Sequence, residues 1–258
     1  MSEHLDYQSK KELILGFNRA PLAQLVELVN CVSFQDPNKL LASLTWDSVC
    51  KTRMAMEVDL SLVHPIVYML VVNSTGDKFL GYLRGNGGTE TRLRGASCGF
   101  GGHVDILDFI HSAKGVLDPV LTVQGSAYRE LNEELKFKVP EGVIPEGDKV
   151  PQVFGVMNEV GVIYEPDDEV GNTHLAIVAV FQVAEGVTFE SGEVDQIGAP
   201  RWISFDSEEV NDLPWENWSK YLLQAKDGIL EAAGIDGTPL TYAELAGYSS
   251  MEMAIQGA

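Results

Sequence analysis

Three glutamates, Glu130, Glu133 and Glu134, lie within the short stretch 129–134, which reads RELNEE. In an α-helix their i, i+3 and i+4 spacing places the three carboxylates on one narrow arc of the surface. Like charges at this spacing destabilise a helix by about 0.2–0.5 kcal/mol per pair unless a cation compensates them. Hard divalent cations such as Mg²⁺ and Mn²⁺ prefer oxygen ligands and bind substrate phosphates as well. The stretch therefore predicts a metal site that acts on phosphate groups.

The alternative interpretation is a solvated helix face on which Arg129 pairs with Glu133 one turn away. Two glycines, Gly101 and Gly102, favour the metal site because they follow a short apolar, strand-like segment and precede a loop that leads into the helix. Glycine at such a position permits a close backbone approach. The carbonyl of Gly101 could then join the carboxylates around a metal, and His103 lies near enough in sequence to contact a bound anion.

With these residues the chain resembles the Nudix hydrolase family, in particular a bacterial and phage branch of it. The family signature is a glycine, a variable loop, a glutamate, and then Arg-Glu-apolar-x-Glu-Glu on a helix. Gly102 matches the signature glycine and Arg129 the signature arginine. The resemblance implies that Glu130, Glu133, Glu134 and the Gly101 carbonyl bind the metal, and that Arg129, Glu133 and Glu134 serve catalysis.

The resemblance also implies a reaction. A metal-dependent enzyme of this kind would hydrolyse a pyrophosphate bond in a nucleoside diphosphate linked to another moiety, with Mg²⁺ or Mn²⁺ as cofactor. Metal ions can polarise the phosphoryl group, orient the attacking water and lower its pKa. Several acids could take the proton of that water, and the sequence does not choose among them: Glu133, Glu159, Glu165, Asp168 and Glu169.

Basic residues near the glycines are candidates for binding substrate phosphates, because a guanidinium fork suits two oxygens at once. Arg84 is the best of them since it ends a predicted strand near the glycine loop, and Arg92 and Arg94 follow it. A surface ion pair is an equally good interpretation of each arginine. Gly102 and His103 complete the predicted substrate-binding set.

The chain departs from the signature in two places. The loop from Gly102 to Arg129 is longer than usual, and counting back from Arg129 places Leu121 where the first signature glutamate is expected. Its task could pass to one of three acids of the enlarged loop, Asp105, Asp108 or Asp118, or to none. The end of the signature is also altered, to Lys136-Phe137.

Two rival functions share the fold. A nucleotide-metabolite sensor would bind without turnover, but sensors typically lose metal-binding glutamates and all three are present here. A prenyl-diphosphate isomerase would need a catalytic cysteine, and Cys98 is better interpreted as a small buried residue. The three glutamates favour the hydrolase.

Composition limits the partners. A net charge of −20 and a pI near 4.5 would repel long nucleic acids, so a small nucleoside diphosphate derivative is the expected ligand. Three widely spaced cysteines indicate neither a disulfide framework nor a zinc site, which favours a reducing cytoplasm. No apolar run is long enough to cross a membrane. A homodimer is left open.

The expected fold class is α/β, a Nudix-type α/β/α sandwich with a mixed sheet. We expect three parts: a helical N-terminal extension (1–59) with helices over 21–32 and 38–56, a Nudix domain (60–206), and a C-terminal helix with a tail (207–258). Strands are expected at 64–73, 150–158, 160–164, 173–183 and 201–205, and a further strand that follows the first one ends near position 84. The signature helix is expected over 122–137 and a closing helix over 215–233.

Overall fold

The structure is a computed structural model, and it describes residues 12–46, 50–84, 95–139, 154–168, 171–192, 197–242 and 244–245. Three residues singled out above, Arg92, Arg94 and Glu169, lie outside this part of the chain. The same holds for the first residues of the strand that was expected to start at position 150.

A mixed sheet forms the centre of the molecule. Its longest strand, β5 (Leu62–Val72), runs parallel to β11 (His174–Val183), and β11 pairs antiparallel with β10 (Gly155–Ile163). The strand order among the described residues is β13 (Arg201–Ser204), β6 (Lys78–Leu83), β5, β11, β10 and β3 (Val32–Ser33). The two strands expected at 150–158 and 160–164 are one strand, β10, with a register shift between Glu159 and Gly161.

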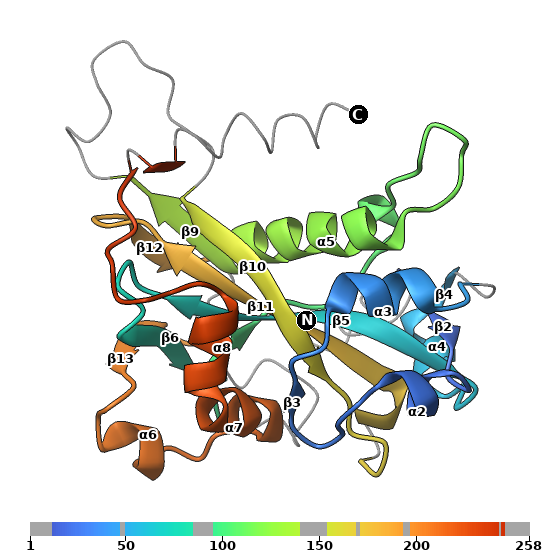
Figure 1. Cartoon of the computed structure of the whole chain (residues 1–258), viewed down its shortest axis with the longest axis horizontal. Coiled ribbons are helices and arrows are strands. Elements are labelled where there is room, and N and C mark those ends of the chain that lie inside the picture. Colours follow the sequence, from blue (N-terminus) through green and yellow to red (C-terminus); the bar gives the residue numbers. More distant parts are fainter. Residues whose placement is uncertain are drawn as a thin grey trace, which may run out of the picture.

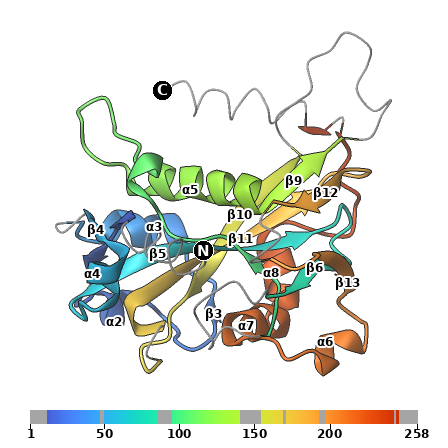
Figure 2. The same ribbon diagram turned by 180° about the vertical axis from the view of Figure 1, so that it is seen from behind.

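Side chains of β5 alternate between two hydrophobic cores, as expected of a strand covered on both faces. Val67 and Met69 belong to the core beneath helix α5 (Pro119–Glu134), whereas Tyr68 and Leu70 belong to the core beneath the C-terminal helices. Figure 1 shows α5 on one side of the sheet and the C-terminal helices α7 (Asn217–Gln224) and α8 (Lys226–Ala232) on the other, and Figure 2 shows the same layers from behind. The fold is therefore mixed α/β, with helices on both faces of a mixed sheet.

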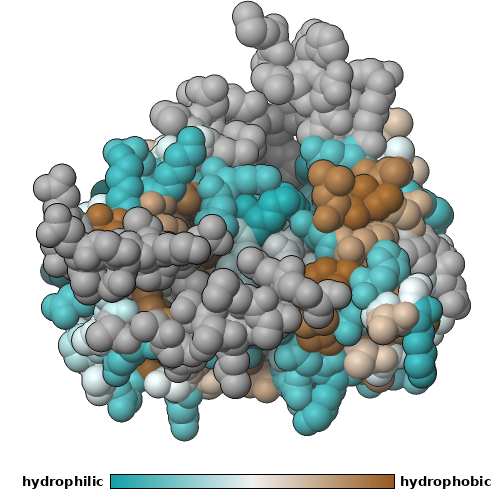
Figure 3. Space-filling view, turned by 90° about the horizontal axis from the view of Figure 1, so that it is seen from above, coloured by the Kyte–Doolittle hydropathy of each residue, from teal (hydrophilic) through white to brown (hydrophobic). Residues whose placement is uncertain are grey.

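Helix α5 carries the signature residues. It begins at Pro119, with the side chain of Asp118 accepting hydrogen bonds from the amides of Val120 and Leu121. It ends at Glu134 rather than at 137, because the next residues form β9 (Leu135–Lys138) and pair with β12 (Thr188–Ser191). Seen from above, on the side of α5, the surface is hydrophilic in the middle and has a hydrophobic patch toward one end (Figure 3).

The expectation of long helices before β5 is wrong. Short elements form instead: β1 (Leu13–Leu15), β2 (Phe17–Asn18), α2 (Leu22–Leu25), β3 (Val32–Ser33), α3 (Pro37–Ser43), β4 (Cys50–Thr52) and α4 (Arg53–Glu57). Tertiary contacts override the local helical pattern, because β2 pairs with β5 and β3 pairs with β10. Three apolar residues of the segment are also buried in the core beneath α5: Leu15, Phe17 and Leu41. This segment is built into the sheet.

The remaining elements follow the expected order with adjusted ends. The hairpin after β5 leads into β6 (Lys78–Leu83), followed by the two-residue strands β7 (Ala96–Ser97) and β8 (Gly99–Phe100). Strand β13 (Arg201–Ser204) pairs with β6. The closing helix is divided into α7 (Asn217–Gln224) and α8 (Lys226–Ala232), after a short helix α6 (Glu209–Asp212). No helix of the described residues combines the length and the apolar character needed to cross a membrane.

Candidate active site

Arg129 is the organising residue of the carboxylate site. Its Nε and Nη2 atoms donate to the two carboxylate oxygens of Asp108 over 2.8 and 2.9 Å, a bidentate pair that spans 21 positions of sequence. Nη2 also donates to the backbone carbonyl of His103 over 3.0 Å. The Asp108 side chain is only 4% exposed, so this pair lies in a poorly hydrated environment where it is held firmly.

Asp108 is therefore the acid that steadies the signature arginine. The other two candidates have different tasks: Asp105 caps the short helix η2 (Ile106–Asp108), and Asp118 caps α5. Leu121 lies in the first turns of α5, so counting back from Arg129 pointed to the wrong element. The extra residues of the enlarged loop lie after the acid, between Asp108 and α5.

Arg129 also contacts two of the three signature glutamates. Its Nη2 lies 2.9 Å from Glu130 Oε1 and its Nη1 lies 3.0 Å from Glu133 Oε2. The pairing of Arg129 with Glu133 across one turn, which the alternative interpretation required, is thus present. It does not exclude a metal site, because the same arginine is anchored by the buried Asp108.

The glycines lie directly against the glutamates. The amide of Gly101 donates to Glu134 Oε2 over 2.7 Å. A Cβ atom on Gly102 would stand 2.8 Å from the carboxylate of Glu130, so only glycine fits there without displacing that side chain. Gly101 has a φ of +130° and a Cβ at that position would meet the Val67 carbonyl at 2.1 Å. The turn predicted from the sequence therefore brings Gly101, Gly102, Glu130 and Glu134 together.

The surroundings of Glu130 suit a cation. Burial raises the pKa of Glu130 to about 7; the charge of Arg129 opposes this shift and that of Glu133 adds to it. The three glutamates do not form a close cluster of oxygens among the described residues, because Glu130 and Glu133 turn toward Arg129 and Glu134 toward the Gly101 amide. Carboxylates of this kind fit Mg²⁺ or Mn²⁺, since a divalent cation would relieve both the burial cost and the mutual repulsion.

This environment predicts how stability depends on pH without metal. Because the folded-state pKa of Glu130 is raised, its contribution to stability is present at low pH and is lost as pH rises from about 4.5 through about 7. In EDTA, we expect Glu130→Gln to gain about 2 kcal/mol in unfolding free energy relative to the wild type between pH 5 and pH 8. Urea denaturation at each pH measures it, and a constant difference across this range would contradict the burial of Glu130.

Arg84, a candidate for phosphate binding, directly follows β6 (Lys78–Leu83). Burial disfavours its charge, but the nearby side chains of Tyr82, Tyr68, Glu216 and Glu134 together raise its pKa. Its Nε atom is buried and has no hydrogen-bond partner among the described residues. The structure thus brings Arg84 into the electrostatic neighbourhood of Glu134, and its unsatisfied donor is available to an anion.

The described acids that were candidates for the general base lie in different surroundings. Glu159 is paired with Gln124 and Asn38, and burial raises its pKa. Glu165 accepts hydrogen bonds from Trp218 Nε1 over 2.6 Å and Tyr221 Oη over 2.7 Å. These contacts tie Glu165 to α7 and give it a structural role.

Asp168 accepts a hydrogen bond from the amide of Gly171 over 2.8 Å and so shapes the loop before β11. Tyr82 and Tyr164 are 5% and 3% exposed and pack in the core.

The ring of His103 does not lie among the carboxylates. It packs against His64 and His174, with ring centroids 4.9 and 5.6 Å away, and only its backbone carbonyl contacts Arg129. His174 is 5% exposed, and its Nδ1 atom lies 3.1 Å from Thr173 Oγ1. Burial lowers the pKa of His64 and His103 well below the usual value, so both rings are neutral at pH 7.

Two residues near the site were missed by sequence reasoning. Glu12 has its pKa raised by burial, and the charges of Arg53, Asp105, Arg129 and Glu133 also act on it. The backbone amide of Arg53 donates to the carbonyl of Glu12 over 2.8 Å. The pairing of β1 with β4 and the bridge between Ile14 and Asp105 bring this N-terminal segment to the carboxylates, and no local pattern in the sequence signals these contacts.

The fold and the site together define a class: a mixed α/β protein with a glycine turn set against an acidic helix whose arginine is held by a loop acid. Comparisons with known proteins agree. The chain is 31% identical over 170 residues to Protein YmaB of Bacillus subtilis (strain 168), covering 65% of this chain and 72% of YmaB. Among solved structures, it resembles Tm1382, a candidate Nudix hydrolase, with a TM-score of 0.59 and 19% identity over 83% of this chain and 98% of that chain.

A NUDIX-family hydrolase from Clostridium perfringens aligns over 65% of this chain and 96% of its own, at 16% identity and a TM-score of 0.33. No family model matches the chain. The chain belongs to the Nudix hydrolase family.

Proposed function

We propose that the protein hydrolyses a pyrophosphate bond in a nucleoside diphosphate linked to another moiety, by attack of water at phosphorus. The observation that carries this proposal is the junction of Gly101 and Gly102 with Glu130 and Glu134, steadied by the pair of Arg129 and Asp108. This junction sets the glycine turn directly against the acidic helix. Family membership supports the same reaction class.

The residues that would hold Mg²⁺ or Mn²⁺ are Glu130, Glu133, Glu134 and the Gly101 carbonyl. When bound, the metal neutralises phosphate charge and activates water. The chain's own contribution is positional: Arg129 pairs with both Glu130 and Glu133, and the Gly101 amide donates to Glu134. Preorganised charges of this kind act without reorganisation during the reaction.

Phosphate binding is proposed for Arg84 first, because of its buried unsatisfied donor and its nearness to Glu134. The same role for Gly102 and Arg92 stays a prediction, whereas the ring of His103 packs against His64 and His174 and is not placed for it. The isomerase alternative is disfavoured by Cys98, which is fully buried beside Ser219, and burial raises the pKa of its thiol to about 12. A thiol in this state is a poor nucleophile and a poor acid.

A substrate panel tests the proposal. With Mg²⁺ or Mn²⁺, we expect the protein to cleave at least one of ADP-ribose, dinucleoside polyphosphates, nicotinamide dinucleotides, nucleotide sugars and deoxynucleoside triphosphates, detected by phosphatase-coupled phosphate release and chromatography. EDTA should stop the reaction. If the folded protein cleaves none of them but its Tm rises with one nucleotide, a sensor function replaces the hydrolase.

A further inference from the structure

Three histidines meet inside the fold, although they are far apart in sequence. His64 on β5 and His174 on β11 are direct partners in the parallel register, and their ring centroids lie 3.9 Å apart. His103 follows β8 and forms a bridge with Ile66, which sets its ring 4.9 Å from that of His64. The backbone pairing of three separate segments therefore brings the imidazoles together.

The imidazoles are arranged as a set of ligands would be. One potential ligand atom from each ring lies within 4.8 Å of the others, and no other such group of three or more occurs among the residues that the structure describes. The Nδ1 atom of His174 lies 3.1 Å from Thr173 Oγ1. A hydroxyl in that position can orient the ring and fix its tautomer, as outer partners of metal-binding histidines do.

The central histidine has no other explanation in the described structure. His64 is 0% exposed, and both of its ring nitrogens are buried without a hydrogen-bond partner there, as is Nε2 of His103. Leaving a buried polar atom unsatisfied costs about 1–3 kcal/mol, so such atoms in native proteins usually have an ion or a water beside them. Replacement by an apolar residue would avoid that cost, and the chain keeps histidine.

We propose that His64, His103 and His174 bind a divalent transition-metal ion of the Zn²⁺ class, at a site separate from the carboxylates of α5. Three nitrogen ligands suit Zn²⁺, Co²⁺ or Ni²⁺, whereas Mg²⁺ and Ca²⁺ require oxygen. Zn–N bonds of about 2.0–2.1 Å need ligand nitrogens roughly 3.3 Å apart, so small rotations of the three rings would close the site. This inference does not depend on the proposed hydrolysis.

The histidine site would act on the carboxylate site through one residue. The backbone carbonyl of His103 accepts hydrogen bonds from Arg129 Nη2 over 3.0 Å and from Ser126 Oγ over 3.3 Å. An ion bound by the His103 ring would therefore fix the turn that carries Gly101 and Gly102 against β5 and β11. We expect a bound metal to stabilise the folded chain rather than to take part in hydrolysis.

Metal analysis of the full-length wild-type protein tests the proposal first. After EDTA treatment and addition of ZnCl₂ in excess MgCl₂, we expect one retained zinc per chain and a rise in Tm of about 5 °C or more. X-ray absorption at the zinc edge should show imidazole ligands, and Co²⁺ should give visible bands without a thiolate charge-transfer band. A protein that retains no zinc, or retains it with oxygen ligands only, overturns the proposal.

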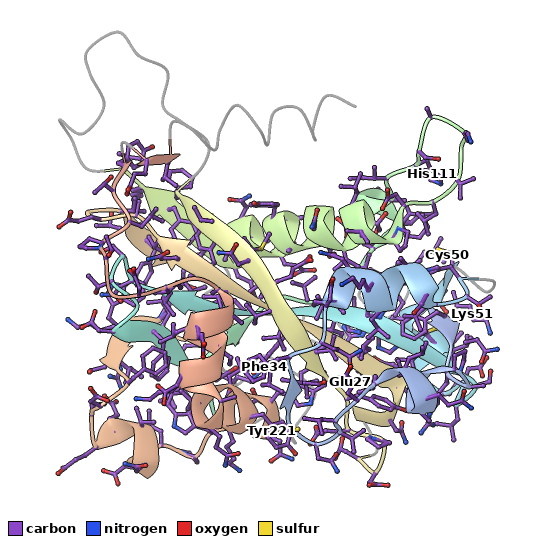
Figure 4. The ribbon with its side chains drawn as sticks, viewed as in Figure 1. Glu27, Phe34, Cys50, Lys51, His111 and Tyr221 are labelled. Atoms are coloured by element: carbon purple, nitrogen blue, oxygen red, sulfur yellow. The ribbon has the colours of Figure 1, made fainter. Side chains whose placement is uncertain are left out.

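Variants then assign the ligands. His64→Gln and His174→Gln should each lose zinc retention and the Tm rise, while His111→Gln should keep both. His111 is the matched control because it is an exposed histidine on the segment between η2 and α5 (Figure 4). If the two cluster variants bind zinc as tightly as His111→Gln, the site lies elsewhere. If they fail to fold, the wild-type absorption spectrum still decides the outcome.

Discussion

Glu134→Gln is expected to lower hydrolysis of the best panel substrate by at least about 100-fold while leaving the fold intact. The side chain of Glu134 is 9% exposed and accepts the amide of Gly101 over 2.7 Å. Glutamine can accept the same hydrogen bond through its amide oxygen, so the turn is kept and only the negative charge is lost. Steady-state kinetics with Mg²⁺ or Mn²⁺ measures the loss, and circular dichroism with thermal melts checks the fold.

Glu231→Gln is the matched control for that experiment. Glu231 is an exposed residue of α8, on the opposite face of the sheet from α5, so the same chemical change there should leave the rate unchanged. Full activity of Glu134→Gln would show that Glu134 does not hold the metal. Equal loss in both variants would point to net charge rather than to the site.

Breaking the pair of Asp108 and Arg129 should be the most destabilising single change among those considered. Asp108→Asn leaves the guanidinium without its bidentate partner in a site where the Asp108 side chain is 4% exposed, at a cost of about 3–5 kcal/mol. Adding Arg129→Met should recover at least about 1 kcal/mol relative to the sum of the single changes, because the double variant loses the pair of Asp108 and Arg129 only once. Chemical denaturation of the two single variants and the double variant measures this coupling.

Asp118→Asn controls for the loss of a loop acid. Asparagine caps a helix as well as aspartate does, so the unfolding free energy of this variant should lie within about 0.5 kcal/mol of the wild-type value. Asp108→Glu should restore part of the stability, since a second carboxylate can still face Arg129. If the changes at positions 108 and 129 add without coupling, the pair does not hold the site together in solution.

The sequence predicted the helix half of the site but not the loop half. The spacing of Glu130, Glu133 and Glu134 was enough to predict their common face, and the glycines predicted a close approach that the structure confirms. The acid that pairs with Arg129 could not be chosen from the sequence. Counting back from Arg129 crosses the extra loop residues, and the sequence does not show where in the loop they are inserted. Among the three loop acids, only the tertiary structure distinguishes two helix caps from the arginine's partner.

Secondary structure was predictable from the sequence where burial produces a recognisable pattern of apolar residues. It was not predictable where a segment becomes a strand only because it pairs with a distant strand. Continuous apolar runs predicted β5 and β11, and the turn after β5 predicted β6. The N-terminal segment has helix-like spacing, yet its strands form because β5 and β10 offer edges to pair with. Strand β12 was missed and β9 was assigned to the helix for the same reason. These two strands form because they pair with each other.

The position of the extra loop residues has a consequence for how this branch can diversify. Asp108 and Arg129 close the loop from both ends across 21 positions, where the usual spacing of the signature would be eight. Closing the longer loop costs only about 1 kcal/mol more. The ion pair of Asp108 and Arg129 thus fixes both ends of the loop. The acidic helix keeps its position whatever segment is inserted between these two residues. A search that demands fixed spacing would pass over such relatives, and a foreign peptide inserted there should leave the fold unharmed.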